Sequence, residues 1–169
     1  TLTVGENLEV ELSWHGLTHV GHRREVNQDS YVAMPPVFAV ADGMGGHQFG
    51  EVASNAAVRI MGGNITKKFH SYLYSLPTQS LQESLQEVME TSITEAHQYV
   101  QREAPGSGTT VTAALVLGQQ VTIAHVGDSR AYSIYPDGRI DTITRDHSLV
   151  KRLEELGHLS KDEAANFPH

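Results

Sequence analysis

Residues 37–47 read Val-Phe-Ala-Val-Ala-Asp-Gly-Met-Gly-Gly-His, an apolar run that leads directly into an acidic, glycine-rich loop. The continuous apolar part predicts a buried β-strand over Val37–Ala41. Asp42 stands at the end of this strand, and the glycines after it expose backbone carbonyls and let a ligand approach closely. This stretch therefore places a charged side chain at the point where a core strand leaves the interior.

The segments on both sides of this stretch predict a mixed fold. Helical periodicity follows Ala53, Ala56, Ala57, Ile60 and Met61, and further helices are expected over about 79–102 and 148–156. Gly62-Gly63-Asn64 and Pro105–Gly108 are expected to be loops. The other β-rich runs are Leu8–Val20, Ser30–Met34, Thr109–Leu117, Val121–Val126, Ala131–Tyr135 and Arg139–Thr144, with hairpin turns at Gly118–Gln120 and Asp137-Gly138. This order predicts an α+β fold in which helices pack on mostly antiparallel sheets.

Composition narrows the function classes. The 169 residues carry 12 Lys and Arg against 20 Asp and Glu, a net charge of −8, which argues against a partner that is nucleic acid or an anionic membrane. No apolar run approaches the roughly 20 residues of a spanning helix, and the first residues show no signal-peptide pattern. The absence of cysteine excludes disulfides, thiolate metal sites and cysteine nucleophiles. We expect one domain, residues 1–169, in the cytoplasm.

Three acidic side chains stand out by position. Asp29 begins a strand, whereas Asp42 and Asp128 follow the ends of apolar strands. Carboxylates that meet where strand ends converge repel one another unless they share a cation. Because oxygen atoms are the ligands on offer, the cation expected there is a hard one, namely Mg²⁺, Mn²⁺ or Ca²⁺.

Each candidate also has a simpler structural interpretation. Asp42-Gly43 could form an ordinary turn, Asp29 could cap an Asx-turn, and Asp128 could pair with a neighbouring arginine, Arg130. His47 could cap the helix that follows it, and Arg24 could be one of two solvated arginines. None of these residues, taken alone, decides the function.

Five polar or glycine-rich stretches follow one another along the chain: Gly21–Asp29, Val40–His47 with Gly50–Ser54, Ser107–Thr110, Ala124–Tyr132 and Thr144–Val150. In order and spacing they resemble the motifs of protein phosphatase 2C, the metal-dependent serine/threonine phosphatases, in their bacterial form. The resemblance covers about residues 15–169.

The resemblance implies a function and a set of site residues. It implies hydrolysis of phosphoserine and phosphothreonine in proteins by a metal-activated water, with Mg²⁺ or Mn²⁺ in two or three sites. Asp42 and the Gly43 carbonyl would bind metal, Asp29 would act on the same cluster largely through water, and Asp128 would serve a third metal position. Arg24 matches the arginine that binds the substrate phosphate, and His47 matches a histidine near the bacterial site.

The resemblance also implies features that the sequence does not contain. Two later metal-binding aspartates of the family, one before Gly and one before Asn, have no counterpart after Asp146. We therefore expect a catalytic domain that lacks its C-terminal strands, an incomplete α-β-β-α sandwich with the start of the flap region at 147–169, and weak activity from these residues alone. Phosphoprotein substrates and a cognate Ser/Thr kinase are the expected partners. The alternative is a non-catalytic relic that binds phosphoproteins.

Overall fold

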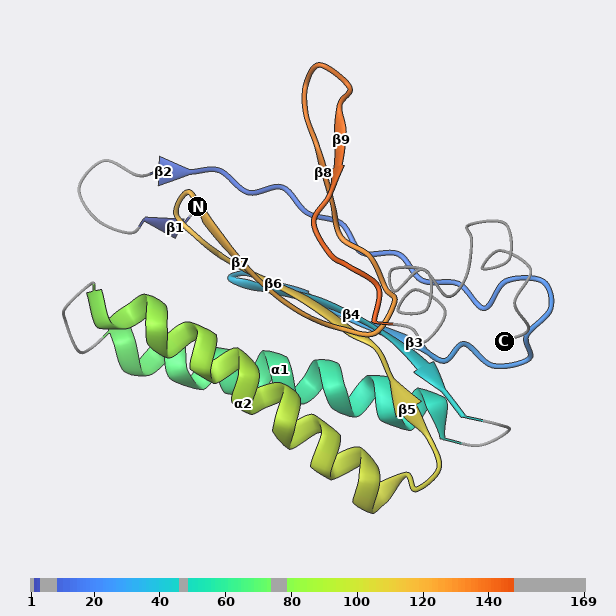
Figure 1. Ribbon diagram of the computed structural model, residues 1–169. Helices are drawn as coiled ribbons and strands as arrows, with labels where there is room; N and C mark the ends of the chain where they lie inside the picture. Colours follow the sequence, from blue (N-terminus) through green and yellow to red (C-terminus); the bar gives the residue numbers. More distant parts are fainter. Residues whose placement is uncertain (1, 4–8, 46–48, 74–78, 148–169) are drawn as a thin grey trace, which may run out of the picture.

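The computed structural model of the chain describes residues 2–3, 9–45, 49–73 and 79–147 (Figure 1). His47, the expected helix at 148–156 and the expected flap region from residue 148 onward lie outside these residues.

The centre of the molecule is an antiparallel sheet with the strand order β3-β4-β6-β7. Its strands are β3 (Asp29–Met34), β4 (Val37–Met44), β6 (Val111–Leu117) and β7 (Gln120–Val126), and the two-residue strand β5 (Gly108–Thr109) pairs with the end of β4. The sequence predicts these strands to within a few residues. The main difference is that the run expected over Thr109–Leu117 is divided at Thr110 into β5 and β6.

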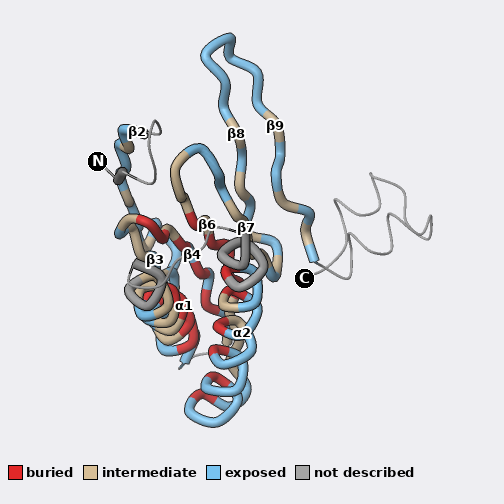
Figure 2. Tube along the Cα trace, turned by 90° about the vertical axis from the view of Figure 1, so that its left-hand side faces the viewer, coloured by how far each residue is buried: buried red, intermediate tan, exposed pale blue. Residues whose placement is uncertain are grey.

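Two long helices cover one face of this sheet, α1 (Gly50–Leu73) and α2 (Gln79–Glu103) (Figure 1). Alternate residues of β4 point into the layer between sheet and helices, where Val37, Ala39 and Ala41 are at most 3% exposed. Met61 and Ile65 of α1 are fully buried against them. Figure 2 shows that the buried residues gather between the helices and the sheet, so this layer is the hydrophobic core.

Two short ribbons complete the described chain. β1 (Leu2–Thr3) pairs with β2 (Glu9–Val10), and β8 (Tyr132–Ile134) pairs with β9 (Ile140–Thr142) in a hairpin that projects from the body (Figure 1). The predicted turn at Asp137-Gly138 joins β8 to β9, as expected.

The strand expected over Leu8–Val20 is wrong for residues 11–20, which form no strand. This segment is held mainly by side chains: the ring of Trp14 meets that of Phe38 edge-on at 6.1 Å, and the Tyr31 hydroxyl donates to the Gly16 carbonyl at 3.4 Å. An alternating sequence pattern predicts a strand, but a strand also needs a backbone partner, and none of the described residues supplies one.

The loop expected at Gly62-Gly63-Asn64 is also wrong, because α1 continues through it. Glycine disfavours a helix interior by about 1 kcal/mol relative to alanine. Here the flanking Met61 and Ile65 are fully buried in the core, and their burial outweighs that local preference. The absence of a side chain at Gly62 also lets α1 lie close to Val32 of β3, whose methyl groups are 3.7 and 4.0 Å from the position of an added Cβ.

The α+β class that the sequence predicts is confirmed, with a helical layer packed on an antiparallel sheet. Among the described helices, neither is both long and apolar enough to cross a bilayer.

Candidate metal centre

Asp29 and Asp42 face each other across the β3–β4 hairpin. They are cross-strand partners at the open end of the pair, one at the start of β3 and the other near the end of β4. The pKa of Asp42 is raised above its ordinary value of 3.8, first by burial and then by the charge of Asp29 and a hydrogen bond to it. Two carboxyl groups held this close favour a shared proton or a shared cation.

Asp128 and Arg24 act on the same carboxyl group from other parts of the chain. The charge of Asp128, in the turn after β7, raises the pKa of Asp42 further, and the charge of Arg24 lowers it. The structure therefore brings Asp29 and Asp42 into direct proximity and places Asp128 and Arg24 within electrostatic range of them. Arg24, Asp29 and Asp42 all lie within residues 24–42, whereas Asp128 comes from the turn after β7, far along the chain.

A cavity of about 440 Å³ opens beside the two facing carboxylates. Asp29 and Asp42 line it together with Tyr31, Ser129 and Arg130. It lies on the sheet face opposite the helices, because Tyr31 and Asp42 alternate with residues that point into the core. The cavity thus offers room for a ligand next to the carboxylates.

Gly43 is packed so closely that no larger residue fits. A Cβ at this position would collide with the carbonyl of Gly50, and it would lie 2.6 Å from the carbonyl of Gln28. The Gly43 N–H donates to the Gln28 carbonyl at 3.1 Å, and the buried Ser54 hydroxyl donates to the same carbonyl at 2.6 Å. The first turns of α1 are thereby joined to the strand end that carries Asp42.

Asn27 supports the start of β3. Its side-chain oxygen accepts a hydrogen bond from the Asp29 N–H at 3.0 Å, and its amide donates to the Thr18 hydroxyl at 2.7 Å. The Asx-turn that the sequence analysis allowed for Asp29 is therefore made by Asn27, two residues earlier. The Asp29 carboxylate takes no part in that turn.

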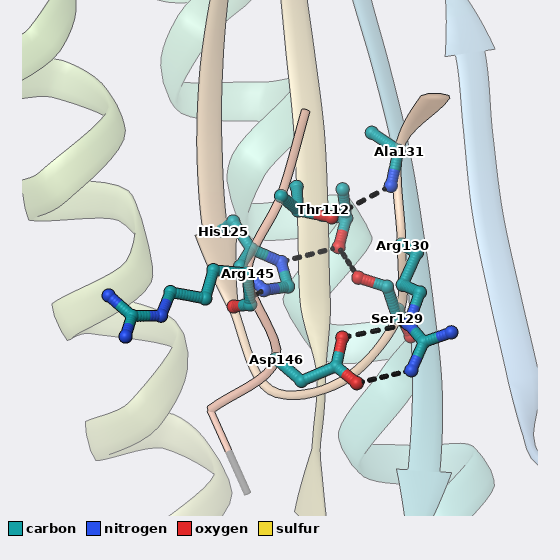
Figure 3. A network of polar contacts seen from close by, with 8 residues as sticks. Thr112, His125, Ser129, Arg130, Ala131, Arg145 and Asp146 are labelled. Atoms are coloured by element: carbon teal, nitrogen blue, oxygen red, sulfur yellow. Dashed lines mark hydrogen bonds and ion pairs between the residues drawn. The ribbon is translucent and has the colours of Figure 1, made fainter. Parts of the chain in front are cut away.

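Asp128 is likewise not the partner of Arg130. The Arg130 guanidinium binds Asp146 through two hydrogen bonds, one of them at 2.8 Å, and this contact raises the pKa of Arg130 (Figure 3). Nearby, His125 bridges the Thr112 hydroxyl at 2.9 Å and the Arg145 carbonyl at 3.0 Å. These contacts attach the segment around residue 146 to β6 and β7.

The donor set of this site fits a hard divalent cation. Asp29 and Asp42 face each other, and the charge of Asp29 raises the pKa of Asp42. A bound cation would reduce the repulsion between the two carboxylates, and carboxylate oxygens are the ligands that hard divalent cations prefer. Within the described residues, no group of three or more His, Cys, Asp or Glu side chains is arranged to hold a metal ion. The site therefore has two facing carboxylates, with a third carboxylate at longer range.

Sequence reasoning assigned no role to several residues that shape the site. Gln28, Ser54 and Thr110 all bond to the backbone next to the carboxylates, but none carries a charge or follows a strand end in the way that Asp42 does. Ser54 and Thr110 are at most 1% exposed. Ser54 and Thr110 do fall inside the matching motif stretches, and Ser54 is also a small polar residue on an otherwise apolar helix face, but neither signal indicates which group the hydroxyl binds.

Comparison with known proteins identifies the family of the chain. The family model described as protein phosphatase 2C matches residues 16–165. A serine/threonine phosphatase named stp from Listeria innocua is 40% identical over 134 residues, covering 79% of this chain and 52% of that protein. The chain thus spans about half the length of this curated relative.

Solved structures agree with this result. The serine/threonine phosphatase PstP/Ppp of Mycobacterium tuberculosis matches with a TM-score of 0.68 and 32% identity, over 89% of this chain and 61% of that chain. A catalytic domain of PstP in complex with two manganese ions matches with a TM-score of 0.66 and 32% identity, over 86% of this chain and 60% of that chain. Manganese, one of the two cations that the motifs imply, is thus bound by a solved relative. The chain belongs to the protein phosphatase 2C family.

Proposed function

We propose that the full-length protein hydrolyses phosphoserine and phosphothreonine in proteins and depends on Mg²⁺ or Mn²⁺. The observation that carries this proposal is the Asp29–Asp42 pair, which faces a cavity of about 440 Å³ in a chain of the protein phosphatase 2C family. The residues that would hold the cations are Asp29, Asp42 and Asp128, together with the carbonyl oxygen of Gly43. Divalent cations in such a site lower the pKa of water and so supply a nucleophile at neutral pH.

Arg24 is proposed to bind the substrate phosphate. Its charge already acts on Asp42, which supports a position near the reacting group. A guanidinium suits this role because its planar fork matches two phosphate oxygens and keeps its charge at every relevant pH. His47 is proposed to lie near the leaving group, as its place in the motif implies.

Phosphoproteins are the proposed substrates, and a Ser/Thr kinase that phosphorylates the same proteins is the proposed partner, both in the cytoplasm. We also propose that residues 1–169 form one catalytic domain whose part after residue 146 begins the flap. These assignments rest on the motifs and on the family.

The test is Mn²⁺-dependent release of phosphate from a phosphothreonine peptide by the full-length protein. We expect Asp42→Asn to reduce the rate by at least about 100-fold, because the lost carboxylate would be a metal ligand. Arg24→Lys is expected to raise KM more than it lowers kcat, because it keeps the charge and loses the fork.

Two results would contradict the proposal. Turnover that Asp42→Asn leaves intact would refute the metal assignment. Binding of the phosphopeptide through Arg24 with no turnover at any Mn²⁺ concentration would favour the non-catalytic relic.

A further inference from the structure

Thr110 stands between β5 and β6, at the point where the pairing of β4 is interrupted. β4 pairs with β5 through Gly43 and Thr109 and with β6 through Val40 and Thr112, and Thr110 lies between these two stretches. In a regular antiparallel ladder, every second pair of facing residues exchanges two backbone hydrogen bonds. The Thr110 N–H does donate to the Asp42 carbonyl at 2.9 Å, but the Asp42 N–H donates to the Thr110 side-chain hydroxyl at 2.9 Å.

The Thr110 hydroxyl thus accepts the hydrogen bond from the Asp42 N–H that a backbone carbonyl would accept in a regular ladder. Through these two bonds, Thr110 holds both the N–H and the carbonyl of Asp42. Thr110 is 1% exposed, so water does not compete for these bonds. The backbone of Asp42 is therefore held at its N–H by the Thr110 hydroxyl and at its carbonyl by the Thr110 N–H, and the Thr109 hydroxyl adds a hydrogen bond to that carbonyl at 3.1 Å.

The same hydroxyl reaches the loop that carries Asp128. The Thr110 and Ser129 hydroxyls are 2.6 Å apart, and the Thr112 hydroxyl donates to the Ser129 carbonyl at 2.9 Å (Figure 3 shows the Thr112 contact). Gly127 lies directly over Thr110, because a Cβ on Gly127 would come within 2.7 Å of the threonine methyl group. Gly127 has a φ of +105°, a conformation that favours glycine. The loop therefore rests on Thr110 through Gly127 and Ser129, the two neighbours of Asp128.

We propose that Thr110 is a positioning residue that fixes the placement of Asp42 relative to Asp128, so that a divalent cation meets both carboxylates in the binding arrangement. The inference rests on the proposed function, since it concerns the same cation site. A single hydroxyl connects the backbone of Asp42 to the residue next to Asp128. Residues that orient metal ligands in this way typically change metal affinity or activity by 10–100-fold when they are mutated.

The experiment measures Mn²⁺ affinity of the full-length protein by calorimetry and by the electron paramagnetic resonance signal of free Mn²⁺. Thr110→Val keeps the shape of the side chain and removes its hydroxyl, and we expect it to weaken Mn²⁺ binding by about 10–100-fold. Thr110→Ser retains the hydroxyl, and we expect affinity close to that of the wild type. Rescue by serine separates loss of the hydroxyl from loss of packing.

Thr66→Val is the matched control. The Thr66 hydroxyl is buried in α1 and has no hydrogen-bond partner among the described residues, so its removal disturbs no contact of the site. We expect Thr66→Val to bind Mn²⁺ as the wild type does. An equal loss of Mn²⁺ affinity in Thr66→Val and Thr110→Val would overturn the proposal, because it would show that removing any buried hydroxyl weakens Mn²⁺ binding.

Further results for the Thr110 and Ser129 variants also test the role of Thr110. Wild-type affinity in Thr110→Val, or affinity in Thr110→Ser as weak as in Thr110→Val, overturns the inference. If Thr110→Val does not fold, as judged by circular dichroism, Ser129→Ala takes its place. It keeps the bond between Thr110 and Asp42 and removes the hydroxyl contact between Thr110 and the loop, so unchanged Mn²⁺ binding in Ser129→Ala refutes the proposal that this contact positions Asp128.

The two proposals fail in different ways. A wild-type protein that binds Mn²⁺ but releases no phosphate contradicts the proposed function and leaves the comparison of Mn²⁺ affinities intact. A wild-type protein that hydrolyses the phosphopeptide while Thr110→Val retains full Mn²⁺ affinity contradicts only the role of Thr110. A wild-type protein that binds no Mn²⁺ contradicts both.

Discussion

The two faces of the central sheet differ in what they do, although the same strands build both. On the face covered by α1 and α2, β4 presents Val37, Ala39 and Ala41, which are at most 3% exposed. On the other face the same strand presents Val40, which is 47% exposed, and Asp42. Residues that alternate along one strand therefore serve stability on one side and the candidate chemistry on the other.

This difference indicates how the site is supported. A pair of carboxylates that repel each other destabilises a fold, and the packed face supplies the stability that offsets it. We therefore expect substitutions on the packed face to change the free energy of unfolding, and substitutions at the carboxylates to change metal binding and stability in opposite directions.

The largest effect is expected at Met61, which is fully buried on the packed face. Met61→Ala leaves a cavity against the sheet and should lower the free energy of unfolding by about 2–5 kcal/mol. Urea denaturation of the metal-free wild type and variant measures this loss of unfolding free energy. Mn²⁺ affinity of the folded protein should be unchanged, and a parallel loss of affinity would show that the two faces are not independent.

A matched pair on one strand sharpens the comparison. Val37→Thr buries a hydroxyl that has no place in an apolar layer and should cost about 1–3 kcal/mol of unfolding free energy. Val40→Thr makes the same chemical change on the open face, where water can reach the hydroxyl, and should stay within about 0.5 kcal/mol of the wild type. Equal costs in the two variants, measured by urea denaturation, would contradict the assignment of the faces.

A smaller effect than those of Met61→Ala and Val37→Thr, and one of opposite sign, is expected at Asp42. Asp42→Asn removes one of two facing like charges, and should stabilise the metal-free protein at pH 7 by up to about 1 kcal/mol, since solvent screens this exposed pair. With saturating Mn²⁺ the order should reverse, because the wild type gains the binding free energy and the variant does not. Thermal unfolding with and without Mn²⁺ measures both.

The difference in stability between metal-free Asp42→Asn and the metal-free wild type should depend on pH, because the pKa of Asp42 is raised in the folded protein. A carboxyl whose pKa is higher in the folded state than in the unfolded state favours folding while it is protonated, below 3.8, and loses that contribution as the pH rises through its folded pKa. The metal-free advantage of Asp42→Asn should therefore shrink toward zero near pH 3. An advantage that is as large at pH 3 as at pH 7 would rule out the charge of Asp42 as its source.

The sequence was sufficient for most of the fold, and it singled out Asp29 and Asp42, which the structure places opposite each other; the roles of the predicted site residues stay predictions. Apolar runs and a helical stripe predicted the strands of the sheet and both helices, because local pattern and tertiary packing agree there. The prediction failed at Gly62-Gly63, where burial of the flanking residues outweighs local preference, and at residues 11–20, where an alternating pattern finds no backbone partner.

The residues of the candidate site also fall into two groups, those that the sequence pattern indicates and those that only the structure reveals. Charged residues at strand ends were found from sequence, since an acid that follows an apolar strand is visible in the pattern. Thr110 and Ser54 were not assigned a role, because a buried hydroxyl becomes informative only when its partners are known: the Asp42 N–H for Thr110 and the Gln28 carbonyl for Ser54. The supporting contacts of a site depend on tertiary structure more than its charges do.

The strand order also bears on how these 169 residues behave in the laboratory. β3 and β7 form the two margins of the sheet, and within the described residues their outer backbone groups have no strand beside them. Val121 and Val126 of β7 are partly exposed, at 54% and 37%. Such margins are templates for strand addition between molecules. Dilute solutions and moderate salt are therefore sensible starting conditions for handling the isolated segment, so that self-association does not obscure its affinity for metal.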